Sequence, residues 1–251
     1  MKRNVWAICL VVAVVAGAVN AELISHWTFN ETSGPLAQDS AGTNDGLVFG
    51  AGWTDGKVDG ALNFNGTSDY VDVGDQDSLD FGATDSFTIT AWIKTTKIES
   101  GIVYKRGIDR LQGPFVEGYG FRVHDGGLYF VIEGADSIGS GIFGTQTVSD
   151  DVWHHVVAVR NTNTDKISLY VDGILDGTPV TDTTTASLET DKPLFIGQIG
   201  SDYTDALFAG KIDDVQIYNH ALSQAEITAL VPEPATLAML GLGGLLLRRK
   251  R

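Results

Sequence analysis

The residues best suited to acid–base chemistry in this sequence are its acids, most of which lie beside Gly, Thr or Ser in predicted turns. Hydrolysis of a glycosidic bond needs two carboxylates held roughly 5–10 Å apart. A strand on which acids alternate presents such a pair, and Glu189-Thr190-Asp191 begins this pattern before Lys192-Pro193 interrupts it. Aspartate in a turn stabilises the turn through local hydrogen bonds. We therefore expect no catalytic residues.

Histidine and cysteine give no metal motif. His154 and His155 are adjacent on an expected strand, so their side chains point to opposite faces and cannot bind one ion together. The other histidines have no ligand spacing. A single cysteine excludes an intramolecular disulfide and a thiolate zinc site.

Asp213 is the acid that most needs a partner. Asp213, Val215 and Ile217 alternate along an expected strand over 211–218, so they share a face. If that face packs on the core, the carboxylate must either coordinate a metal ion or accept backbone N–H bonds.

The aromatic residues could form a stacking surface for sugars. Trp92 lies on the otherwise polar face of an expected strand over 87–94, and Tyr104 and Tyr129 are further candidates, with Trp53 and Tyr119. The alternative is that these rings pack in the core or cover a sheet.

The first 21 residues are expected to be a secretory signal. Two basic residues precede an apolar run over 5–19, and Val19-Asn20-Ala21 places small residues where signal peptidase cuts, between Ala21 and Glu22. The run is shorter than the roughly 20 apolar residues that span a bilayer.

The C-terminal end combines three parts in order. Pro232-Glu233-Pro234 is followed by an apolar stretch over 235–247 and by four basic residues over 248–251. This tail closely resembles the PEP-CTERM sorting signal of Gram-negative bacteria. The resemblance implies transient membrane insertion of a short hydrophobic helix, removal by an exosortase, and a secreted or surface-retained protein, often beside extracellular polysaccharide.

The charge of the exported domain differs from that of the whole chain. The chain has a net charge of −15, and without both ends it keeps 11 basic and 31 acidic residues, a net charge of −20 over 22–230. Such a surface lacks the clustered cations that bind phosphates, so we expect no nucleic-acid partner.

The region between the two ends has the pattern of an all-β domain. Short runs of β-branched and aromatic residues are separated by Gly, Asp and Asn clusters. Asn65-Gly66, Asp125-Gly126-Gly127 and Asp172-Gly173 each predict a turn, the first two within hairpins. One helix is expected near the end, where Ser223 and Glu226 form a capping box and Leu222 and Ile227 a hydrophobic staple.

Eight short sequence motifs along this region are similar to motifs of the laminin-G-like jelly-roll family. They are Trp27-Thr28-Phe29, Asp39-Ser40-Ala41-Gly42, Gly60-Ala61-Leu62-Asn63-Phe64-Asn65-Gly66, Phe87-Thr88-Ile89-Thr90-Ala91-Trp92, Trp153-His154-His155-Val156, Leu169-Tyr170-Val171-Asp172-Gly173, Leu194-Phe195-Ile196-Gly197 and Gly210-Lys211-Ile212-Asp213-Asp214-Val215-Gln216-Ile217-Tyr218. The resemblance implies an all-β fold, a two-sheet antiparallel jelly-roll sandwich of the concanavalin A-like type. Related folds hold a structural calcium between this last strand and the N-terminal loop, which implies Asp213 and Asp39 as ligands, with oxygens from Asn44 and Asp45.

The expected organisation is a signal peptide over 1–21, the jelly-roll domain over 22–230 and the sorting signal over 231–251. We expect an exported, non-enzymatic module that binds carbohydrate or another envelope component. Two alternatives are a glycoside hydrolase with an unrecognised carboxylate pair and a structural matrix protein without a small ligand.

Overall fold

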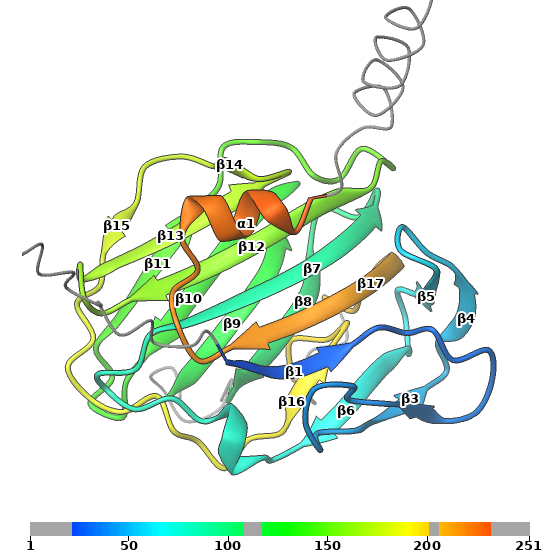
Figure 1. The fold of residues 1–251 in the computed structure, drawn as a ribbon, viewed down its shortest axis with the longest axis horizontal. Coiled ribbons are helices and arrows are strands. Elements are labelled where there is room, and N and C mark those ends of the chain that lie inside the picture. Colours follow the sequence, from blue (N-terminus) through cyan, green and yellow to red (C-terminus); the bar gives the residue numbers. More distant parts are fainter. Residues whose placement is uncertain (1–21, 108–116, 201–205, 232–251) are drawn as a thin grey trace, which may run out of the picture.

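Two antiparallel sheets, of nine and eight strands, lie face to face in the computed structural model, which describes residues 22–107, 117–200 and 206–231 (Figure 1). Apolar residues from the facing sides of both sheets form one core. The architecture is the predicted jelly-roll sandwich.

The nine-stranded sheet has seven strands in its main path, and two more strands pair with members of that path. The path runs β14 (Ile174–Leu175), β13 (Lys166–Val171), β12 (His154–Asn161), β7 (Phe87–Thr95), β17 (Ala209–Tyr218), β5 (Gly60–Asn65) and β4 (Gly52–Asp55). In addition, β1 (Leu23–Trp27) pairs with β17, and β15 (Val180–Thr181) pairs with β13.

The eight-stranded sheet covers the other side of the core. Its order is β11 (Gly139–Phe143), β10 (Gly127–Glu133), β9 (Gly118–His124), β8 (Ser100–Arg106), β16 (Leu194–Ile196), β6 (Tyr70–Gly74), β3 (Gly46–Phe49) and β2 (Leu36–Ala37). A short 3-10 helix, η1 (Asp77–Leu79), follows β6.

Two of the three predicted turns connect paired strands. Asp125 (φ 50°) and Gly126 (φ 80°) join β9 to β10, and Asp172 (φ 52°) and Gly173 (φ 78°) join β13 to β14. Positive φ at both central residues is what a tight hairpin turn requires.

The hairpin predicted at Asn65-Gly66 is wrong. β5 pairs with β4 and β17, whereas β6 pairs with β16 and β3, so the turn carries the chain from one sheet to the other. The Asn65 side chain instead accepts the N–H groups of Thr67 (2.8 Å) and Ser68 (3.0 Å). The residue types specify a turn, and the burial of the flanking strands decides which sheets it connects.

The one α-helix of the described chain, α1 (Gln224–Ala229), covers part of the outer face of the nine-stranded sheet (Figure 1). Both bonds of the predicted Ser223–Glu226 capping box are present. Leu222 and Ile227 form a small apolar cluster with Val157 and Val159 of β12. No helix within the described ranges is long and apolar enough to cross a membrane.

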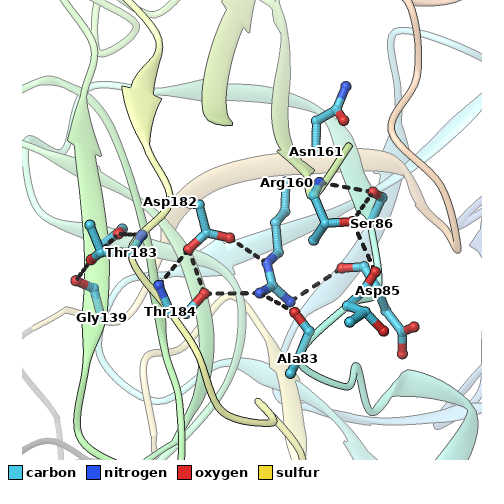
Figure 2. Close-up of polar contacts among 12 residues, drawn as sticks. Ala83, Asp85, Ser86, Gly139, Arg160, Asn161, Asp182, Thr183 and Thr184 are labelled. Atoms are coloured by element: carbon cyan, nitrogen blue, oxygen red, sulfur yellow. Dashed lines mark hydrogen bonds and ion pairs between the residues drawn. The ribbon is translucent and has the colours of Figure 1, made fainter. Parts of the chain in front are cut away.

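A buried arginine on β12 holds two loops, 82–85 and 182–184 (Figure 2). Arg160, at the end of β12, is fully buried, and its guanidinium donates to Asp182, Gly82, Ala83, Asp85 and Thr184 at 2.8–3.2 Å. All three nitrogens are bonded within the protein, so this cluster holds the fold together.

Candidate functional site

Trp53 forms the apolar wall of a depression at the edge of the nine-stranded sheet. It lies on β4 in register with Leu62 of β5, so its ring is on the core side and packs partly against the core. The indole Nε1 donates to the carbonyl oxygen of Gly34 at 3.0 Å. The residue is half-buried, and its remaining surface lines the depression.

Polar groups form the rest of this site, which we call the Trp53 depression. Besides Trp53 it is lined by Asn30, Glu31, Thr32, Thr54, Asp55, Asp59 and Gly60. Lys211 fixes one side, because its Nζ donates to the Thr54 hydroxyl (3.2 Å) and to the Asp55 carbonyl (3.1 Å). Three carboxylates and one amide therefore surround a single aromatic ring.

An unusual backbone conformation places two of these groups. Phe29 is fully buried and has φ 50°, a left-handed conformation that a bulky residue rarely adopts. It directs the chain so that Asn30 Oδ1 accepts the N–H of Gly60 at 2.7 Å. Glycine is required there, because a Cβ on Gly60 would lie 2.3 Å from the Phe29 carbonyl oxygen. Such strain is often found at functional sites.

Glu31 has one carboxylate oxygen without a hydrogen-bond partner. Its Oε1 accepts the N–H of Gln38 at 2.7 Å, which fixes the carboxylate. Its Oε2 is buried and has no hydrogen-bond partner within the part of the chain that the structure describes. The exposed carboxylates of Asp55 and Asp59 are acceptors beside the same indole wall, and this combination can hold a ligand that has both hydroxyl groups and an apolar face.

Asp213 lies on the outer face of its sheet, contrary to the expectation that it shares the core face of Val215. It is in register with Trp92, while its neighbour Ile212 faces the core. Asp214 has φ 50° and forms a bulge, and the extra residue reverses the alternation of sides.

The turn between β4 and β5 covers Asp213 and Trp92. Asp213 Oδ2 accepts the N–H groups of Lys57 (2.7 Å) and Val58 (2.8 Å), and Lys57 Nζ lies 5.0 Å from the centre of the Trp92 ring. Asp213 is fully buried, and burial raises its pKa to about 6, with a smaller contribution from the charge of Asp214.

The Asp39 carboxylate accepts hydrogen bonds from the backbone of its own loop and of β1. Its two oxygens accept N–H groups from His26, Ala41, Gly42 and Asn44 at 2.8–3.1 Å. Burial acts to raise its pKa, but these bonds hold the pKa below the usual value. Asp39 and Asp213 share no hydrogen-bond partner in the described ranges, and the calcium site stays a prediction.

The three aromatic residues proposed for stacking lie on two different sheets. Trp92 is on the outer face of the nine-stranded sheet and is 3% exposed, and Tyr104 is on the eight-stranded sheet and is 4% exposed. Covered rings cannot stack on a sugar, so the expectation is corrected for these two. Tyr129 is half-buried on β10 and packs against Phe143 of β11.

One group of ionisable side chains has a spacing that could hold a metal ion. Within the described residues, Glu99, His124 and Asp125 have ligand atoms within 4.8 Å of one another. However, Glu99 lies 2.8 Å from His124 Nδ1, whereas Asp125 lies 3.7 Å from Nε2. The two ring nitrogens point apart, so each acid faces a different side of the imidazole.

Some of the predicted residues lie outside the described ranges. These are Ala21 of the signal cleavage site and Pro232-Glu233-Pro234 of the sorting motif, whereas Glu22 begins the described chain and is exposed.

Sequence reasoning missed most of the Trp53 depression. It named Trp53 as a possible stacking residue but not Asn30, Glu31, Asp55 or Asp59. Asp55 and Asp59 flank a short turn and could have been grouped with Trp53 on that basis. Asn30 and Glu31 gave no local signal, because the backbone conformation of Phe29 brings them there.

Solved structures share this fold at low sequence identity. The binding domain of Paraclostridial Mosquitocidal Protein 1 is 18% identical (TM-score 0.64), and the match covers 84% of this chain and 52% of that one. Domain 4 of AbnA, a GH43 extracellular arabinanase from Geobacillus stearothermophilus, in complex with arabinotriose, is 18% identical (TM-score 0.60), with 84% and 99% covered. The ligand binding domain of botulinum neurotoxin serotype D, in complex with N-acetylneuraminic acid, is 15% identical (TM-score 0.62), with 84% and 50% covered.

The chain spans about half the length of these toxin domains. No curated protein sequence matches it. Family models match two consecutive segments: the Concanavalin A-like lectin/glucanases superfamily over residues 65–228, and the PEP-CTERM protein-sorting motif over residues 230–251. The chain therefore belongs to the concanavalin A-like lectin/glucanase superfamily and carries a PEP-CTERM sorting signal at its C-terminal end.

Proposed function

We propose that the exported domain is a non-enzymatic carbohydrate-binding module whose saccharide site is the Trp53 depression. The observation that carries this proposal is the half-buried indole wall of Trp53 bordered by the exposed carboxylates of Asp55 and Asp59. Sugars have apolar C–H faces and hydroxyl edges, so one aromatic ring with acceptors beside it suits them. Three carboxylates favour a neutral sugar over an acidic one.

The structural neighbours are consistent with a binding role. Two neighbours of the same fold were solved with arabinotriose and with N-acetylneuraminic acid, and others are toxin binding domains. At 15–18% identity these neighbours suggest which sugars to test first, but they do not identify the ligand of this domain.

The sorting motif supports a location outside the cytoplasm. PEP-CTERM motifs imply exosortase-dependent processing and export to the cell envelope or surface. We propose that signal peptidase cuts between Ala21 and Glu22, that the tail inserts transiently in the inner membrane of a Gram-negative bacterium, and that the mature module binds polysaccharide at the cell surface or in the matrix.

The test is a binding assay on immobilised saccharides, in which neutral arabinotriose should bind more tightly than N-acetylneuraminic acid, whose carboxylate the three acids repel. Trp53→Ala should weaken binding by at least about tenfold, the equivalent of roughly 1.4 kcal/mol, while Trp53→Phe keeps a ring and should retain part of the affinity. Because Trp53 also packs on the core, Asp59→Asn serves as a second variant with little effect on folding.

Asp165→Asn is the matched control for Asp59→Asn. Both aspartates are exposed and have positive φ, 59° and 50°, but Asp165 does not line the Trp53 depression. Only Asp59→Asn should reduce binding. Equal binding by wild type and all variants would refute the site, turnover of a bound sugar would favour a hydrolase, and no binding to any sugar would favour a structural matrix protein.

A further inference from the structure

A second aromatic surface lies on the eight-stranded sheet, far from the Trp53 depression. Phe143 of β11 is 59% exposed, and its ring stacks on Tyr129 of β10 with centroids 4.4 Å apart and planes inclined by 30°. The two residues are direct partners in the β10–β11 register. An exposed ring supported from behind by another ring is a rigid, flat apolar surface.

The charged groups that border this surface are two carboxylates, Glu99 and Asp125, and one cation, Arg122. Arg122 lies 5.0 Å from the Tyr129 ring centre, and the His124 ring is 5.8 Å from Tyr129 and 5.5 Å from Phe143. Glu99 lies 2.8 Å from His124 Nδ1 and 3.6 Å from Arg122. We call these six residues the Phe143 patch.

Glu99 keeps its charge in this arrangement. Burial acts to raise its pKa, but the Asp125 N–H, His124 and Arg122 together hold the pKa below its usual value. The carboxylate therefore compensates the Arg122 cation. Asp125 adds a second carboxylate 3.7 Å from His124 Nε2, so a neutral, hydroxyl-rich ligand fits this surface better than an acidic one.

A buried aspartate organises the loop at the rim of the patch. A pocket beside Phe143 is lined by His124, Asp125 and the loop residues 144–147. Asp176 is 1% exposed, and its Oδ1 accepts the N–H groups of Thr145 (2.8 Å) and Gln146 (3.0 Å). A binding site needs this kind of support behind it to keep its geometry without a ligand.

The two aromatic surfaces lie at opposite edges of the sandwich. β4 is the last strand of one sheet path, and β11 packs near β13 and β15 at the other end of that path (Figure 1). Strands are about 4.8 Å apart, so a path of seven strands separates the surfaces by roughly 30 Å. A short oligosaccharide cannot contact both.

We infer that the Phe143 patch is a second saccharide site, for a neutral sugar, and that one molecule can bridge two glycan chains. This inference rests on the proposed carbohydrate-binding function. It adds a consequence that a single site does not give, because two separated sites turn a binding module into a cross-linker of polysaccharide.

The test uses the same immobilised oligosaccharides with four proteins: wild type, Trp53→Ala, Phe143→Ala and the double variant. Each single variant should keep part of the binding, and the double variant should lose all of it. Beads coated with the same oligosaccharides should be aggregated by wild type and by neither single variant. Ile174→Ala, which removes another highly exposed apolar side chain, should behave as wild type.

A further variant tests the polar part of the patch without removing a ring. Glu99→Gln removes the negative charge that faces His124 and Arg122. When it is combined with Trp53→Ala, it should weaken the sugar binding that remains in Trp53→Ala. Complete loss of binding in Trp53→Ala alone, with the fold intact by circular dichroism, overturns the second site but leaves the proposed function standing. Absence of binding by wild type overturns both.

Discussion

Replacing Arg160 by alanine should be among the most destabilising changes in this domain. The guanidinium is fully buried and makes five hydrogen bonds, one of them from Nε to Asp182 Oδ2 at 2.8 Å. Asp182 has a side chain that is only 5% exposed. Removing the arginine leaves this carboxylate buried without its cation and leaves the carbonyl groups of Gly82 and Ala83 without a donor.

The expected cost follows from these contacts. Breaking a buried ion pair by removing one partner costs about 3–5 kcal/mol. Asp182 keeps its bonds from the N–H and the hydroxyl of Thr184, which places the expected loss toward the lower end of that range. For a domain of this size, about 3 kcal/mol corresponds to a fall in Tm of roughly 6–12 °C.

The assay is urea unfolding of wild type, Arg160→Ala and Arg160→Lys, followed by tryptophan fluorescence. Lysine keeps the charge but not the planar fork of donors, so Arg160→Lys should lie between the other two. Lys166→Ala is the control, because Lys166 makes an exposed bond to Thr181, worth at most about 0.5 kcal/mol. A loss below about 1 kcal/mol in Arg160→Ala would show that these loops are held by other contacts.

Three further predictions concern Asp213, the calcium site and the helix cap. The pKa of Asp213 is about 6 in the fold and 3.8 unfolded, so its ionisation destabilises the fold: the loss is absent below about pH 4 and complete above about pH 6. Asp213→Asn should therefore raise stability at pH 7.5 by up to about 2–3 kcal/mol but not at pH 4, as measured by unfolding at both values. A structural calcium at Asp39 and Asp213 should make Tm rise with added calcium and fall with EDTA, whereas an unchanged Tm would mean that the four backbone N–H groups alone satisfy Asp39. Ser223→Ala should cost about 1 kcal/mol, read from thermal unfolding, because it removes the capping box of α1.

The sequence correctly predicts those features of the fold that depend on residues close together in the chain. Its predictions are wrong where the structure depends on contacts between distant parts of the chain. Alternation along 87–94 correctly predicts β7, which ends one residue later, and the Ser223–Glu226 spacing correctly predicts the start of α1. The Asn65-Gly66 turn looks local, yet the sheets it connects depend on packing far along the chain. Likewise, no residue type announces the bulge at Asp214 that moves Asp213 to the outer face.

The candidate sites depend even more strongly on such distant contacts. Trp92 is on the polar face of its strand, as the alternation indicates, but the turn carrying Lys57 covers it. No sequence pattern marks Phe143 as a candidate, although its ring is more exposed than that of Trp92. Exposure is set by the loops that cross a sheet, and a strand pattern contains no information about those loops.

The ends of the described chain leave both aromatic surfaces open. Glu22 lies beside Asn219, which donates its backbone N–H to the Glu22 carbonyl at 3.1 Å, and Val231 lies close to Gly173 on the nine-stranded sheet. Whatever follows Val231 therefore starts next to α1, at neither β4 nor the outer face of β11 (Figure 1). The sorting motif begins at this point, so the two proposed sugar sites lie on other parts of the domain than the segment to be processed.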